Sequence, residues 1–188
     1  MESTQVKQSV SRSSIYKAWM SSKKYVFDTS VFIQLQSFLE DFGYEIIDLP
    51  HSRLLRGYSS TLNVIADAIN LKKCYVTESV VKEVLAAEEK GKLWKGTSRF
   101  IKEYFGIIDN KNPVANGENP KELLNKSGDA KQYEERQYKL VWDSMKLVGG
   151  NVDVFLLTVD DELSELGEAN EIVAVNMWHL ASHVGVFV

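Results

Sequence analysis

The stretch KKYVFDTSVFIQL, residues 23–35, places a carboxylate and two hydroxyls in the middle of a segment that is otherwise apolar. Residues 25–27 form an apolar run typical of a short buried strand, and Asp28, Thr29 and Ser30 follow it. Apolar residues then recur at helical spacing, which predicts a helix. Polar residues at such a junction either cap the helix or form the floor of an active site.

Short apolar strands alternate with helices along the rest of the chain. This alternation is typical of a parallel sheet that is covered by helices on both faces. We therefore expect an α/β fold, a three-layer α/β/α sandwich around a central parallel sheet. Besides residues 25–27, the strands are predicted at residues 74–77, 153–159, 171–176 and 184–188.

One domain is expected for a chain of 188 residues with 44% hydrophobic residues. Residues 1–22 are predicted to be a polar N-terminal extension, and residues 23–188 the domain. Residues 106–128 contain two of the three prolines together with several glycines and asparagines, which indicates a long loop or insertion.

Charge and composition exclude several classes of protein. A net charge of −4 argues against a protein that is held to nucleic acid by its overall charge, but it allows an enzyme that gathers acids in one cleft. The single cysteine excludes an intrachain disulfide, which fits a reducing compartment. No run approaches the roughly 20 apolar residues that span a bilayer. We expect a cytoplasmic protein with no membrane association.

Four carboxylates are predicted to meet at one edge of the sheet. Asp28 and Asp160 each follow a predicted strand, and ligands of parallel sheets bind at the carboxyl ends of the strands. Glu83 and Asp143 lie on predicted helices that lead to or from neighbouring strands. Because such carboxylates repel one another, a divalent cation is expected between them, and oxygen ligands favour Mg²⁺ or Mn²⁺.

The order of these motifs, FDTSVF, then VVKEV, then a helical aspartate, then LLTVDDEL, resembles that of the PIN-domain nucleases. The family pattern is an apolar strand that ends in Asp with Thr or Ser next, a helical Glu, a helical Asp and a strand that ends Thr-x-Asp. The resemblance covers roughly residues 24–105 and 130–188. The matching positions are Asp28 with Thr29 and Ser30, Glu83, Asp143, and Thr158 with Asp160.

The resemblance implies a metal-dependent endoribonuclease with Mg²⁺ or Mn²⁺ as cofactor and RNA as substrate. The resemblance leaves open whether the protein forms a homodimer or binds a protein partner. The segment around Asp143, WDSMKLV, departs from the small apolar residues of the family, so Asp161 or Asp153 could replace it. The implied catalytic residues and metal ligands are Asp28, Glu83, Asp143 and Asp160, with Ser30, Thr158 and Asp161 in support.

The stretch KGKLWKGTSRFIKEYF, residues 90–105, interleaves basic and aromatic side chains. Lys95 and Arg99 are candidates for contacts with RNA phosphates, with bases stacked on the aromatic rings. An amphipathic helix whose lysines lie along apolar surface explains the same pattern. His179 and His183 have a spacing that can bind zinc, but no third ligand is evident, and a plain helix is the preferred interpretation.

Two other functions fit parts of the sequence. The first is a PIN-like module that binds RNA or protein without catalysis, which an incomplete acid set would explain. The second is a phosphohydrolase with Asp28 as nucleophile, similar to the haloacid-dehalogenase-like enzymes. Their pattern has a second aspartate two positions after the first, where this chain has Ser30.

Overall fold

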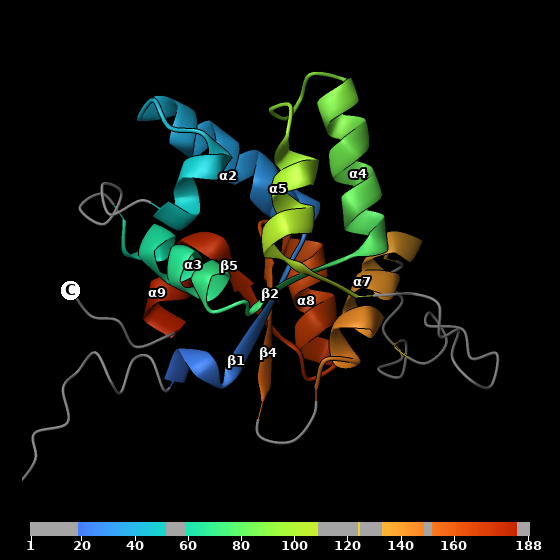
Figure 1. Ribbon diagram of the computed structural model, residues 1–188. Helices are drawn as coiled ribbons and strands as arrows, with labels where there is room; N and C mark the ends of the chain where they lie inside the picture. The colour runs from blue at the N-terminus through green and yellow to red at the C-terminus, as the bar shows by residue number, and fades with distance from the viewer. Residues whose placement is uncertain (1–18, 52–58, 109–123, 125–132, 149–151, 184–188) are drawn as a thin grey trace, which may run out of the picture.

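A computed structural model describes residues 19–51, 59–108, 124, 133–148 and 152–183. Its centre is a sheet of five parallel strands in the order β3-β2-β1-β4-β5 (Figure 1). This confirms the predicted α/β class and the parallel sheet. The strands are β1 (Lys23–Phe27), β2 (Cys74–Thr77), β3 (Gly106–Ile108), β4 (Asp153–Thr158) and β5 (Val173–Asn176).

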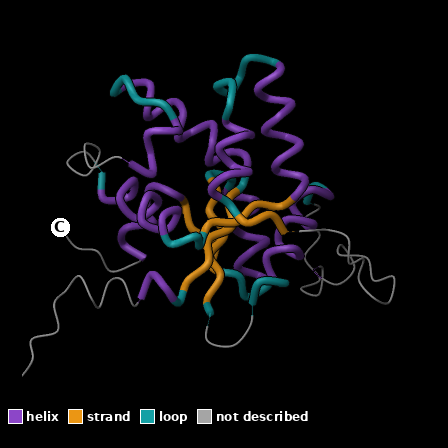
Figure 2. The backbone as a smooth tube through the Cα atoms, viewed as in Figure 1, coloured by secondary structure: helices purple, strands orange, loops and turns teal. Residues whose placement is uncertain are grey.

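Helices cover both faces of the sheet, as expected for three layers (Figure 2). Helices α3 and α9 lie on one side of the strands and α7 and α8 on the other, while α2 and α4 extend beyond the carboxyl edge (Figure 1). No helix in the described part of the chain is long and apolar enough to cross a membrane. The helices are α2 (Thr29–Asp41), η1 (Ile46–His51), α3 (Ser60–Asn70), α4 (Glu78–Glu89), α5 (Thr97–Tyr104), α7 (Glu135–Met145), α8 (Asp161–Ala169), η3 (Met177–His179) and α9 (Leu180–His183).

The strand order reverses between β1 and β4. From β1 the chain builds outward to β2 and β3, and from β4 it builds outward to β5 on the other side. Phe27 is in register with Leu157, and the backbone N–H of Asp28 donates to the Leu157 carbonyl at 3.0 Å. The residues that follow the two strands therefore lie side by side at a topological switch point, where open α/β sheets bind their ligands.

Strand β1 lies at the centre of the core. Tyr25, Val26 and Phe27 are all fully buried, because the strand has a neighbour on each side and helices above and below. The Phe27 ring packs edge-on against Phe105 at 5.0 Å between centroids and also contacts Phe32. The apolar run that precedes Asp28 thus fixes the position of that carboxylate.

One boundary of the predicted insertion is wrong. Its first residues, Gly106–Ile108, form the edge strand β3, which pairs with Tyr75, Val76 and Thr77 of β2. The strand is only three residues long and begins with glycine, so it carries no alternating or extended apolar pattern that would identify it. Residues 109–123 and 125–128 of the predicted insertion, the N-terminal 18 residues and the predicted strand at 184–188 lie outside the described residues.

Gly106→Ala should destabilise the protein by about 1–3 kcal/mol, the usual cost of overpacking. A Cβ at this position would lie 2.6 Å from two carbons of the Tyr75 ring on the neighbouring strand. Urea denaturation of Gly106→Ala in the wild-type and the Tyr75→Ala backgrounds measures the effect. The cost should shrink when the ring is absent, and an equal cost in both backgrounds would contradict this packing.

Candidate functional site

Asp28 both caps a helix and lies at the sheet edge, so the two interpretations of its motif are compatible. Its side chain is 3% exposed and stands at the N-cap of α2. Oδ2 accepts hydrogen bonds from the Ser30 N–H at 3.3 Å, the Ser30 hydroxyl at 2.5 Å and the Thr158 hydroxyl at 3.3 Å. These bonds fix the orientation of the carboxylate.

Glu83 reaches the same edge from α4. The Thr29 hydroxyl donates to Oε2 of Glu83 at 2.5 Å. Because Thr29 is the first residue of α2, this bond ties the start of α2 to the middle of α4. The sequence shows the Thr next to Asp28 but does not show that its partner is the helical glutamate.

Asp160 follows β4 and caps α8. Its Oδ1 accepts from the backbone N–H groups of Glu162 at 3.0 Å and Leu163 at 3.3 Å. Its Oδ2 accepts from the Gln137 side-chain amide at 3.0 Å, and its own N–H donates to the Thr158 hydroxyl at 3.0 Å. Thr158 therefore connects Asp28 and Asp160 directly.

Arg136, in the first turn of α7, lies between these acids. Its Nη1 is 3.6 Å from Oε2 of Glu83, and its Nη2 is 3.7 Å from Oδ2 of Asp160. Its Nε donates to Oε2 of Glu134 at 2.6 Å. The hydrogen bond with Glu134 raises the pKa of Arg136, partial burial opposes this, and the charges of Asp28 and Glu83 raise the pKa further. The side chain of Arg136 thus forms ion pairs with Glu83, Glu134 and Asp160.

A cleft opens at this place. It is bounded by α7, α8, the start of α4 and the end of β1, and the acids that face it come from distant parts of the sequence. Its lining residues are Asp28, Ser79, Val80, Glu83, Arg136, Gln137, Leu140 and Leu163.

Asp143 does not join the other three acids. It is fully buried and pairs with Lys146 at 2.8 Å and Lys139 at 3.4 Å. It follows Arg136 by two helical turns, about 10 Å along α7. Since Lys24 of β1 donates to the carbonyl of Leu147, α7 runs toward the amino edge of the sheet, away from the cluster. The sequence spacing alone does not reveal this direction.

The two aspartates considered as replacements for Asp143 do not fill its role either. Asp153 begins β4 at the amino edge, where it pairs with Lys23. Asp161 is exposed in the first turn of α8, where a negative charge stabilises the helix dipole. Neither has a hydrogen bond or ion pair with Asp28, Glu83 or Asp160 among the contacts of the described residues.

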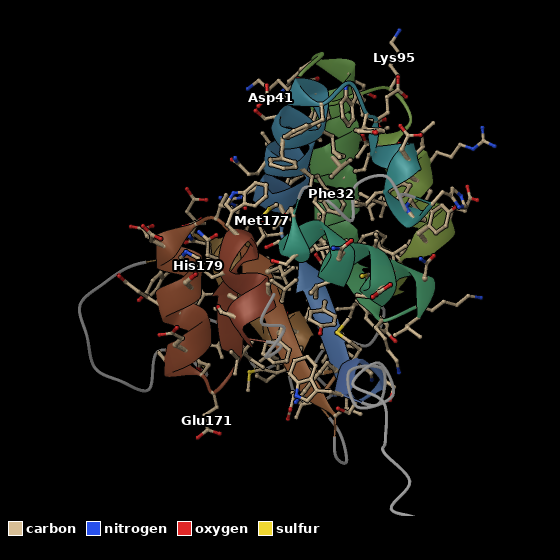
Figure 3. All side chains as sticks on the ribbon, turned by 90° about the vertical axis from the view of Figure 1, so that its left-hand side faces the viewer. Phe32, Asp41, Lys95, Glu171, Met177 and His179 are labelled. Carbon is tan, nitrogen blue, oxygen red and sulfur yellow. The ribbon has the colours of Figure 1, made fainter. Side chains whose placement is uncertain are left out.

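The basic candidates lie on the surface. Lys95 and Arg99 are both exposed, the first between α4 and α5 and the second in α5. Figure 3 shows Lys95 pointing away from the protein. His179 is exposed at the end of η3, and the side chain of His183 lies outside the described residues.

Arg136 and Gln137 are the residues of the site that the sequence motifs do not reveal. Apolar spacing places the start of their helix near residue 130, which hides the fact that these residues stand in its first turn. The signal that marks the true start is a capping box, in which Glu134 and Gln137 bond each other's backbone N–H groups. A Glu-x-x-Gln pattern at residues 134–137 could have identified it.

The carboxylate oxygens of the site are ligand atoms of the kind that divalent cations prefer. Asp28, Glu83 and Asp160 offer only oxygen ligands, which Mg²⁺ and Mn²⁺ prefer, and Glu83 and Asp160 already pair with a positive charge. As they lie here, no three acidic, histidine or cysteine residues within the described ranges are close enough to hold a metal ion. The charge between the carboxylates is that of Arg136.

Thr158→Val should destabilise the fold by about 1–3 kcal/mol, because the fully buried hydroxyl serves both Asp28 and the N–H of Asp160. Thr97→Val is the matched control, since that buried hydroxyl donates to the Trp94 carbonyl three residues earlier and lies at the start of α5. Urea denaturation of both variants measures the difference. A smaller cost for Thr158→Val than for Thr97→Val would count against the coupling of the two aspartates.

The chain matches no protein-family model, no curated protein and no solved structure. The interpretation of the site therefore depends on its geometry and on the sequence motifs.

Proposed function

We propose that this protein is an endoribonuclease of the PIN type that uses Mg²⁺ or Mn²⁺. One observation carries the proposal: Glu83 and Asp160 both pair with a single cation, Arg136, and Asp28 lines the same cleft at the point where the strand order reverses. These acids come from the end of β1, the middle of α4 and the end of β4. Their convergence is hard to explain by helix capping, because Glu83 caps no helix.

In this proposal Asp28, Glu83 and Asp160 would hold the divalent cation. A bound divalent cation supplies a water of lowered pKa and stabilises the charge that develops on the phosphate. The other residues of the site keep the carboxylates oriented, which typically matters 10- to 100-fold for affinity or activity. Ser30 and Thr158 orient Asp28, Thr29 orients Glu83, and Gln137 orients Asp160.

The RNA backbone would be attracted by the basic side chains on the α4–α5 side. Lys95 and Arg99 are exposed, and α4 leads from Glu83 at the cleft toward the loop that holds Lys95. Phosphate contacts of this kind position a nucleic acid without reading its sequence. We propose these two residues as backbone contacts for single-stranded RNA.

A second function is favoured by one specific observation. Arg136 already balances the acids, so the cluster has no need of a metal for its stability. A PIN-like module that binds RNA or protein without cleaving anything would have such a cluster. The two functions differ in whether the phosphodiester bond is broken.

The test is cleavage of fluorescent single-stranded and hairpin RNAs, with DNA of the same sequence for comparison, in Mg²⁺, Mn²⁺, Ca²⁺ or EDTA. The nuclease proposal expects cleavage of RNA in Mg²⁺ or Mn²⁺ and none in EDTA. RNA that is bound but stays intact in every condition would support the non-catalytic module. The absence of both RNA binding and RNA cleavage would contradict both proposals.

A further inference from the structure

A cavity opens at the amino edge of the sheet, at the opposite ends of the strands from Asp28 and Asp160. Its volume is about 530 Å³, which lies within the roughly 300–1,000 Å³ typical of small-molecule sites. It is lined by the end of α3, the start of β2, the end of α5 and the start of β3. Because these segments lie at the amino ends of the strands, the cavity is separate from the cleft that Asp28 and Glu83 line.

Three aromatic side chains line the cavity. Tyr75 and Tyr104 are half-buried, and Phe105 is buried at the junction of α5 and β3. The Tyr75 ring lies against the backbone of Gly106 on β3, where a Cβ would be 2.6 Å from two of its carbons. The ring is therefore held in place before any ligand binds. Aromatic side chains of this kind stack on nucleobases, because every base has a planar face.

Two lysines lie side by side at the same edge. Lys24 and Lys73 directly precede Tyr25 and Cys74, which are in register on β1 and β2. Like charges that lie opposite each other on neighbouring strands repel, which costs stability. Within the described ranges neither lysine forms an ion pair with an acid. An anion bound nearby would relieve this repulsion.

Positive charge also reaches the cavity itself. Lys72 lines it, and Nζ of Lys24 lies 5.8 Å from the centroid of the Tyr75 ring. Glu103 supplies one negative charge to the wall, so the lysines outnumber the acid. Aromatic rings beside an excess of lysines match a ligand that joins a planar aromatic group to an anion.

The backbone of Lys72 is in a conformation that favours glycine. Lys72 follows the C-cap of α3 with a φ of 54°, in the left-handed region. Glycine does occupy the same place after α2 and α4, as Gly43 and Gly91. The lysine therefore costs stability that a glycine would not, and residues in such conformations cluster at binding and active sites. A role for its side chain in the cavity would explain this cost.

We propose that this cavity binds a nucleotide, with the base stacked on the tyrosine rings and the phosphate held by Lys72 and Lys24. The nucleotide is either free or the end of an RNA strand, and the two sources share this chemistry. The inference goes beyond the proposed function, because it concerns the opposite edge of the sheet and needs no metal.

Calorimetric titration of AMP into the full-length protein in EDTA tests the proposal. AMP should bind in a saturable way, and adenosine and ribose 5-phosphate should each bind more weakly, because one lacks the phosphate and the other lacks the base. Tyr75→Leu keeps an apolar side chain on β2 but removes the ring. It should bind AMP at least about fivefold more weakly than wild type, because base stacking is lost.

Lys72→Gly and Glu171→Gly form a matched pair of variants. Glu171 follows the C-cap of α8 with a φ of 62° and is exposed before β5, at the other side of the sheet. Both changes should raise the melting temperature by about 2–4 °C, because glycine adopts this conformation freely. Lys72→Gly alone should weaken AMP binding, by about fivefold, because it removes an exposed charge that pairs with the phosphate.

The outcomes are distinct. No binding of AMP by the wild-type protein would overturn the proposal, and so would AMP binding that neither Tyr75→Leu nor Lys72→Gly weakens. An equal loss in Glu171→Gly would trace the effect to the glycine and overturn the role of Lys72. None of these results depends on a cation site or on cleavage, so the proposed function stands or fails separately.

A second titration, with 5′-phosphorylated tetraadenylate RNA in EDTA, separates the two sources. Tighter binding of this RNA than of AMP, lost in Tyr75→Leu, would identify the end of an RNA strand as the ligand. Binding of AMP that is as tight or tighter would identify a free nucleotide. RNA binding that Tyr75→Leu leaves unchanged, together with no binding of AMP, would place the RNA elsewhere and overturn the proposal.

Discussion

The Asp28→Asn variant is expected to stay folded but to cleave RNA at least about 100-fold more slowly than wild type. Asparagine has the same shape, is as good an N-cap as aspartate, and keeps an oxygen that can accept bonds from Ser30 and Thr158. It lacks the charge that a metal ligand must supply, and removing a direct ligand should cost at least as much as the 10- to 100-fold typical of its supporting residues. Initial rates of cleavage in saturating Mn²⁺ measure the effect.

Asp41→Asn is the matched control for this variant. Asp41 is exposed at the far end of the same helix, about 20 Å from Asp28 at 1.5 Å per residue. The control makes the same chemical change and should cleave RNA at the wild-type rate. If Asp28→Asn also cleaves at that rate, Asp28 is a structural cap and the nuclease proposal fails.

Phe27→Ala should have the largest effect on stability, about 3–5 kcal/mol. Phe27 is fully buried on the central strand, and its ring contacts Phe32 and Phe105. Such a loss is a large part of the roughly 5–15 kcal/mol that folded domains have in total. At about 2–4 °C per kcal/mol for a chain of this size, the melting temperature should fall by roughly 6–20 °C.

The control for Phe27→Ala is Ile33→Ala. Ile33 lies on α2, close in sequence, but its side chain is 46% exposed. Its truncation should change the free energy of unfolding by less than about 0.5 kcal/mol. Similar losses in the two variants, measured by thermal unfolding, would contradict the placement of β1 at the centre of the core.

The central strands can be predicted because their local and tertiary requirements agree. Strands β1 and β4 are buried on both faces, so each appears in the sequence as an unbroken apolar run that leads to a capping aspartate. The sequence pattern therefore suffices to place Asp28 and Asp160 at the same edge, and the position of Glu83 follows from the helix after β2.

The remaining features depend on tertiary structure. Strand β3 is three residues long and exists because β2 offers it a partner. The position of Asp143 does not follow from the sequence, because a helix of uncertain start has no defined face toward the site. Arg136 cannot be identified from the sequence for a different reason. The sequence predicts that crowded acids need a cation, but it does not indicate that an arginine of the same chain is that cation.

The central proposal is that Asp28, Glu83 and Asp160 together bind one divalent cation. The most direct measurement is anomalous scattering from crystals of the wild-type protein grown with Mn²⁺. We expect a single strong peak in contact with these three carboxylates. A cleft without a peak at saturating Mn²⁺ would contradict the proposal.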